Sequence, residues 1–155
     1  MKQLKVYAIV LLLSVPLFAQ NKKAPPKLVL GEIGDPITAV TKVLGRPNRI
    51  ENHGDLETYT YQVFQGSMQF VVDHGTIIET TYTAYDLIPM DATYKFVSFE
   101  FGLKAEGYVL LSDDQSWTRT VRMISKNASA TMTSYVSGRL ADMSTYTFKC
   151  ICQKL

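Results

Sequence analysis

The sequence has 155 residues, with 16 Lys and Arg against 14 Asp and Glu, so its formal net charge is only +2. This balance leaves no basic stripe to attract phosphate backbones, which argues against a nucleic acid as the partner. The length suits a single domain with its own hydrophobic core, and the aromatic and Thr residues spread along the chain favour strands.

A secretory signal peptide is predicted over residues 1–19. Met1 to Lys5 is a basic start, and Val6 to Phe18 is an apolar run that is short against the ~20 residues of a membrane-spanning helix. We therefore expect cleavage near Ala19, export to the periplasm or the exterior of a bacterium, and no stable membrane insertion after the signal is removed. No Cys lies near the cut, so no lipid anchor is expected, and the polar residues 20–27 are interpreted as a flexible leader.

Residues 28–155 are predicted to form one domain, which begins with a short helix over residues 36–44. Asp35 is a favourable N-cap residue, and Pro36 fits the first helical position, where its missing N–H costs nothing. Gly45 can adopt the positive φ that often ends a helix. The apolar side chains of this helix recur on one face at Ile37, Val40 and Leu44.

Three strands are predicted to follow this helix, paired antiparallel through short turns. Residues 48–57 are polar and are interpreted as a loop or the end of a strand, whereas residues 57–64 alternate as a strand does. Residues 65–67 are expected to turn the chain, and residues 73–75 have the composition of a tight hairpin before a strand at 76–83. The inner face of the middle strand is expected to consist of Met68, Phe70 and Val72.

The second half of the chain repeats this order. Asp91 is the candidate N-cap of a helix over residues 92–106, and Gly107 stands where a C-terminal glycine belongs. A strand is the alternative for these residues, because their apolar side chains also alternate, but the caps and the length favour the helix. A loop is predicted at 113–116, strands at 117–125, 128–136 and 143–152, and connections at 126–127 and 137–139.

The predicted fold class is α+β, with short helices packed on an antiparallel sheet. Helix followed by three strands occurs twice, in candidate repeat units at residues 28–85 and 91–152, which suggests an internal duplication.

Residues 34–82 carry a recognisable pattern. Its parts are Leu44-Gly45-Arg46-Pro47, Tyr59-x-Tyr61, Met68-x-Phe70-x-Val72 and Gly75-Thr76-Ile77. The pattern resembles the SmpA/OmlA-type outer-membrane assembly lipoproteins and the repeat unit of the beta-lactamase inhibitor proteins. The resemblance implies helices against a small antiparallel sheet, and a non-enzymatic role in binding another envelope or secreted protein, as an inhibitor, immunity protein or assembly factor.

No arrangement of residues in the sequence predicts catalysis, a metal site or a cofactor. His53 and His74 each lie next to a Gly in a turn context, without a third partner at a defined spacing. Asp113-Asp114 lacks the alternating ligands and the Gly of a calcium loop, so a solvated loop is expected. We therefore expect that the protein is not an enzyme.

Cys150 and Cys152 are two residues apart, so a strand would place both sulfur atoms on one face. Two packed or free thiols are the first alternative. A disulfide suits an exported protein but is strained at this spacing, because the two Cα atoms of an extended strand lie ~6.5–7 Å apart. Metal binding or redox chemistry is the third alternative.

The sequence favours a protein-binding module that acts through a sheet face or edge. A small-molecule or lipid carrier, with an apolar pocket between helices and sheet, is the alternative. Tyr59, Tyr61 and Trp117 are the candidate anchors of one binding surface, because aromatic side chains with a polar group are frequent at protein interfaces. The competing interpretation is that these three residues belong to the sheet core.

Overall fold

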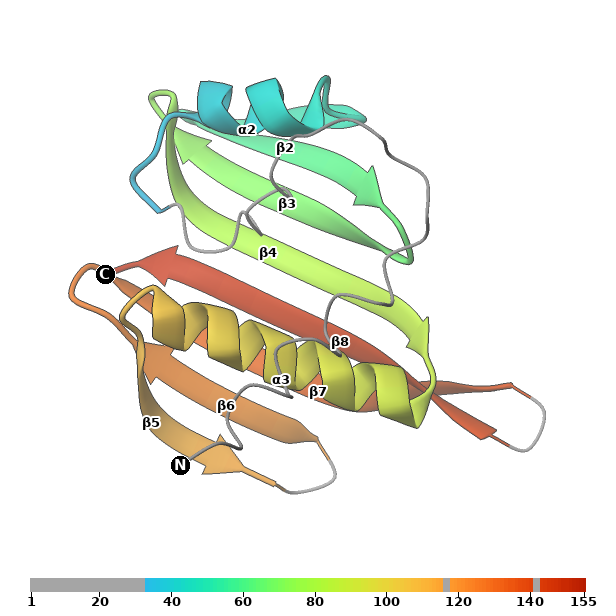
Figure 1. Ribbon diagram of the computed structural model, residues 1–155. Helices are drawn as coiled ribbons and strands as arrows, with labels where there is room; N and C mark the ends of the chain where they lie inside the picture. Colours follow the sequence, from blue (N-terminus) through green and yellow to red (C-terminus); the bar gives the residue numbers. More distant parts are fainter. Residues whose placement is uncertain (1–32, 116–117, 141–142) are drawn as a thin grey trace, which may run out of the picture.

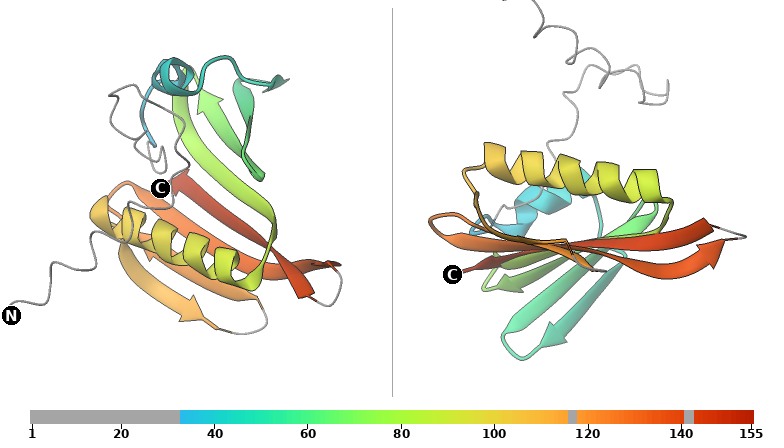
Figure 2. Two further views of the ribbon diagram at one scale, coloured as in Figure 1. Left: turned by 45° about the vertical axis from the view of Figure 1, so that its right-hand side comes forward. Right: turned by 90° about the horizontal axis from the view of Figure 1, so that it is seen from below.

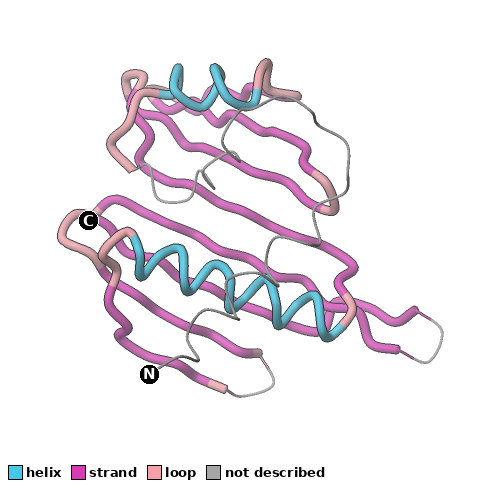
Figure 3. Tube along the Cα trace, viewed as in Figure 1, coloured by secondary structure: helices cyan, strands magenta, loops and turns pink. Residues whose placement is uncertain are grey.

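The computed structural model describes residues 33–115, 118–140 and 143–155, which form two helices and eight strands (Figure 1 and Figure 3). The predicted signal peptide, the leader and Trp117 lie outside the described residues. In chain order the elements are α2 (Ile37–Leu44), β1 (Arg49–His53), β2 (Leu56–Val63), β3 (Gly66–Asp73), β4 (Thr76–Leu87), α3 (Pro89–Ala105), β5 (Val109–Asp114), β6 (Arg119–Ile124), β7 (Ala128–Leu140) and β8 (Met143–Lys154).

All eight strands belong to one antiparallel sheet, in the order β1-β2-β3-β4-β8-β7-β6-β5. Strands β1 to β4 follow α2 and strands β5 to β8 follow α3, and the last strands of the two halves, β4 and β8, pair with each other (Figure 1). The α+β class, with helices on an antiparallel sheet, is confirmed. Each half has four strands and not the predicted three, and an internal duplication stays a prediction.

The two strands that the sequence did not predict are the edges of the sheet. β1 occupies the polar stretch interpreted as a loop or strand end, and it pairs with β2 from Arg49 opposite Thr60 to His53 opposite Leu56. β5 contains Asp113, which was expected in a loop and instead pairs with Val121 of β6. An edge strand has one pairing partner and exposes most of its side chains, so a polar sequence is compatible with it.

Two turns also differ from the prediction. Gly66 is the first residue of β3, and the turn before it contains Gln65 with φ +54°. Residues 137–139 lie inside β7 and do not form a connection, because a bulge between Val136 and Gly138 absorbs the irregularity while the ladder with β8 continues. The hairpin between β3 and β4 lies where it was predicted.

Both helices begin differently from the prediction. Pro36 and Ile88 occupy the N-cap positions in an extended conformation, and neither makes a side-chain cap hydrogen bond. The predicted N-caps Asp35 and Asp91 are therefore wrong. Asp35 lies one residue too early because its carbonyl accepts a hydrogen bond from the Ile77 N–H of β4 at 2.9 Å. Asp91 lies in the first turn of α3, where the helix dipole favours a carboxylate.

The helix ends agree with the prediction. Gly45 has φ +80° and Gly107 has φ +87°. After α3 the N–H of Tyr108 donates to the carbonyl of Leu103 at 3.0 Å, and the N–H of Gly107 donates to that of Lys104 at 3.1 Å. These two bonds are the pattern of a helix end that needs a left-handed residue. The helical alternative for residues 92–106 is confirmed.

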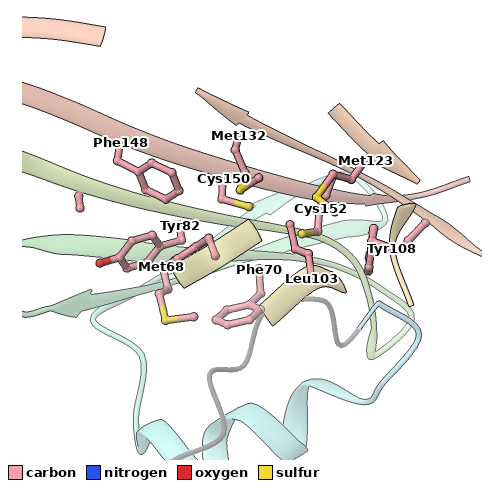
Figure 4. Packing of buried hydrophobic residues seen from close by; sticks show 14 of the residues in the cluster. Met68, Phe70, Tyr82, Leu103, Tyr108, Met123, Met132, Phe148, Cys150 and Cys152 are labelled. Atoms are coloured by element: carbon pink, nitrogen blue, oxygen red, sulfur yellow. The ribbon is translucent and has the colours of Figure 1, made fainter. Parts of the chain in front are cut away.

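The core lies between the helices and one face of the sheet, and Figure 2 shows both helices on that same side. Phe99 of α3 packs at 4.8 Å between ring centroids against both Tyr82 and Phe148. Figure 4 shows Phe148 and Tyr82 near the sulfur-containing side chains of Cys150 and Met132. The fully buried large residues are Phe70, Phe96, Phe148, Ile77, Leu87, Leu103, Met123, Met132, Val40, Val72, Val121 and Thr80.

Candidate interaction surfaces

The predicted anchors Tyr59 and Tyr61 lie on the helix-covered face of β2. Tyr61 is only 3% exposed, and its ring meets that of Phe70 edge-on, with centroids 5.8 Å apart. Tyr59 is half-buried, and its hydroxyl donates to Oε2 of Glu57 at 3.1 Å. Burial raises the pKa of both tyrosines. The structure brings these two together, while the third anchor, Trp117, lies outside the described residues.

Three buried hydroxyl groups lack a hydrogen-bond partner within the part of the chain that the structure describes. They belong to Thr60, Tyr61 and Thr80. Tyr61 and Thr80 lie on the helix side of the sheet, and Thr60 lies on the opposite side. A buried hydroxyl without a partner costs ~1–3 kcal/mol, so each of these groups locally destabilises the fold.

Cys150 and Cys152 are two free, fully buried thiols on the helix-covered face of β8. Figure 4 shows both sulfur atoms among core side chains, near Met132 and Met123. The hydrogen bond with the Cys152 thiol and burial both hold the pKa of Cys150 well above its usual range. This environment favours inert, protonated thiols, because a reactive cysteine needs access and a lowered pKa.

The remaining titratable candidates are spread over the surface. His74 is exposed in the β3–β4 turn, with Nδ1 2.6 Å from Oδ1 of Asp73, and His53 is exposed at the end of β1. Asp113 is paired with Arg119, and the hydrogen bond from that guanidinium lowers the pKa of the Asp113 carboxyl. Within the described ranges, no three His, Cys, Asp or Glu side chains come together as a metal site.

A cleft of about 240 Å³ lies at the start of α3. Arg119 borders it, with its guanidinium 4.2 Å from the centre of the Phe96 ring and its nitrogens on the Asp113 carboxylate. The other lining residues are Pro89, Ala92, Thr93, Ser134 and Tyr146. Pockets for small ligands usually occupy ~300–1,000 Å³, so this cleft is small for a carrier.

The face of the sheet turned away from the helices is open and rich in threonine. One row of side chains crosses it from strand to strand, as the cross-strand pairs show: Thr60, Gln69, Thr81, Ile151, Thr131 and Arg122. The charged side chain of Glu79 on this face accepts a hydrogen bond from Gln153 at 2.7 Å. Thr60 and Thr81 of this row are buried, Thr131 is partly exposed, and Arg122 is the one charged residue in the row.

Two tyrosines stand on this open face where the two halves of the sheet join. Tyr135 of β7 pairs with Thr147 of β8 and is 39% exposed. Tyr85 lies in the bulge of β4 beside the same stretch of β8; it is 46% exposed, and its hydroxyl lies 3.4 Å from that of Ser67. Thr147 between them is buried. Sequence reasoning missed both tyrosines, although Tyr135 continues the face of Thr131 and Thr133, opposite to the core residue Met132.

No protein-family model and no curated protein matches the chain. Among solved structures, it is similar to an extracellular protein with an SCP domain from Bacillus anthracis, at a TM-score of 0.43 and 14% identity over 90% of this chain and 49% of that one. It is also similar to a cysteine-rich secretory protein from Staphylococcus aureus, at a TM-score of 0.37 and 10% identity over 76% of this chain and 44% of that one. The chain spans about half the length of these two proteins.

A third similar structure is a candidate beta-lactamase inhibitor protein from Streptococcus mutans. The TM-score is 0.37 and the identity 16%, over 75% of this chain and 74% of that one. In the described part of the chain, neither helix has the length and apolar character that crossing a membrane requires.

Proposed function

We propose that the protein is an exported, non-enzymatic binding module of the bacterial envelope, which holds another envelope or secreted protein on its open sheet face. The observation that carries the proposal is the pair Tyr85 and Tyr135, both partly exposed on the face that no described helix covers. Tyrosine is enriched among the residues that dominate binding energy at protein interfaces, because it combines a large apolar ring with a polar group.

The surroundings of the two tyrosines support an interface. The neighbouring positions Thr83, Lys149 and Thr133 form a row across β4, β8 and β7, with one charged residue among them. The centre of a protein interface is poor in charged residues, and a non-obligate interface as a whole is no more apolar than the rest of the surface. The strands under these residues are paired on both sides, so the side chains stand on a rigid frame that loses little freedom on binding.

The inhibitor, immunity or assembly-factor role remains part of this proposal, as does export through a signal peptide cleaved near Ala19. Tyr59 and Tyr61 lie on the helix-covered face and not on this open face. A contribution of Tyr59, Tyr61 and Trp117 to partner binding therefore stays a separate prediction. The carrier alternative is less favoured, because the cleft beside α3 holds about 240 Å³.

Alanine substitution at Tyr85 and Tyr135 tests the proposal. The tagged wild-type protein is used to capture a partner from envelope extract of the source bacterium, and binding of the purified partner is then measured by calorimetry. We expect each variant to weaken binding by roughly tenfold or more, which corresponds to ~1.4 kcal/mol. Val43→Ala is the control, because Val43 is 55% exposed on α2, on the helical side of the sheet and away from Tyr85 and Tyr135. Equal binding by wild type, Tyr85→Ala and Tyr135→Ala would contradict the proposal.

A further inference from the structure

Helix α3 carries an apolar stripe on its outer side as well as its core-facing side. Met90, Tyr94, Val97 and Phe101 follow one another at i, i+4, i+7 and i+11, so they form one line along the helix. Their exposed fractions are 73%, 55%, 54% and 75%. The buried residues of the same helix, Ala92, Phe96, Phe99 and Leu103, lie on the opposite side. Exposed contiguous apolar surface of this kind marks an interaction site on a monomer.

We propose that this outer stripe is a dimer interface, at which α3 of one copy packs antiparallel against α3 of a second copy. The proposal concerns a different surface from the open sheet face and does not depend on the function proposed above. At about 200 Å² for a whole side chain, the four exposed residues offer roughly 500 Å² per copy. Two copies would then bury roughly 1,000 Å² from these side chains alone, which is the lower limit for a specific interface.

The composition of the stripe favours a second copy over another protein. Homodimer interfaces are more apolar than non-obligate ones, and none of the four residues is charged or makes a described hydrogen bond. The charged side chains at the rim are already satisfied within the helix, since Lys104 donates to Glu100 at 2.7 Å. The open sheet face, which mixes hydroxyl and methyl groups, has the composition expected for a different partner.

The stripe is also complementary to itself. A two-fold axis between Tyr94 and Val97 places Met90 of one copy beside Phe101 of the other, and Tyr94 beside Val97. Methionine sulfur and aromatic rings attract one another, so each pair of Met90 and Phe101 stabilises the dimer by more than its buried area alone. Antiparallel neighbouring helices are a common packing arrangement and satisfy the self-complementarity that a two-fold dimer requires.

Sedimentation of the full mature chain over a wide range of concentration tests the proposal. We expect a reversible monomer–dimer equilibrium, and we expect Val97→Asp to raise the dimer dissociation constant roughly tenfold or more. Val43→Asp is the matched control, because Val43 lies on α2 and is 55% exposed, close to the 54% of Val97. Its dissociation constant should equal that of wild type. Circular dichroism of each variant verifies that the fold is retained.

Variants with one added surface cysteine test the antiparallel arrangement under oxidising conditions, because the native Cys150 and Cys152 are buried. Val97→Cys lies next to the proposed axis and should cross-link to its own copy, whereas two copies of Met90→Cys would be separated by roughly 16 Å along the helices. A wild-type protein that stays monomeric at the highest concentration, or a dimer that survives Val97→Asp, would overturn the proposal. If the protein is instead a monomer that sediments with phosphatidylglycerol vesicles, and Val97→Asp abolishes this vesicle binding, the stripe is assigned to a lipid surface. That result would also overturn the dimer proposal.

Discussion

Tyr61 offers a direct test of how the core is built, because its ring and its hydroxyl contribute in opposite directions. The ring is 3% exposed and meets Phe70 edge-on, whereas the hydroxyl has no partner among the described residues. Tyr61→Phe keeps the ring contact and removes the unpartnered group. Since a buried unsatisfied hydroxyl costs ~1–3 kcal/mol, the free energy of unfolding of Tyr61→Phe should exceed that of wild type by about 1 kcal/mol.

Urea unfolding measures this change through the transition midpoint at constant slope. Tyr61→Ala removes the ring as well, and its free energy of unfolding should be ~3–5 kcal/mol lower than that of wild type. Tyr59→Phe is the matched control on the same strand, because its hydroxyl does have a partner in Glu57; we expect it to be neutral or to lose ~0.5–1 kcal/mol. If Tyr61→Phe is destabilised by more than about 1 kcal/mol, the hydroxyl has a partner and the reasoning is wrong.

The same variant separates packing from binding at Tyr61. If the hydroxyl reaches a partner protein, Tyr61→Phe will weaken capture while the stability is retained. If Tyr61 is core alone, capture by Tyr61→Phe will equal that of wild type.

Three further predictions concern the backbone, the thiols and the response to pH. Gly45→Ala should lower the free energy of unfolding by about 1 kcal/mol, because φ is +80° although the space around an added Cβ is open. Gly66→Ala should prevent stable folding, because its Cβ would overlap the carbonyl oxygen of Thr83. Thermal unfolding of the two variants tests this ranking. Cys150 and its neighbour thiol should react with a disulfide reagent only after urea unfolding, and fast reaction of the native protein would contradict their burial. Burial raises the pKa of Tyr108 from 10.0 to about 12, so the unfolded chain loses this proton at a lower pH than the folded protein does. The free energy of unfolding should therefore fall by about 2–3 kcal/mol as the pH rises from 10 to about 12. The fall should be smaller in Tyr108→Phe, which has no phenol proton at this position.

Local patterns predicted those parts of the fold that local chemistry determines. Gly45 and Gly107 end their helices because only a positive φ completes the last turn, and Met68, Phe70 and Val72 are buried because alternation places them on one face. The class of the fold follows from these two patterns.

The parts that the sequence did not predict depend on pairing between distant segments. β1 and β5 have polar or mixed sequences, and they are strands because β2 and β6 offer them a free edge. Asp35 was a good cap by composition, but the pairing of its carbonyl with Ile77 places it before the helix. Within the candidate site, Tyr85 gained its position from a bulge between β4 and β8, which no local pattern indicates.

The central claim is that a partner protein lies on the open sheet face beside Tyr85 and Tyr135. Site-specific photo-cross-linking in the envelope tests it most directly, with a benzophenone amino acid placed at Tyr135 in one variant and at Val43 of α2 in another. We expect position 135 to form a covalent complex with one envelope protein that position 43 does not capture. A complex formed with that protein from position 43 and none from position 135 would show that the partner binds the helical side, and would contradict the claim.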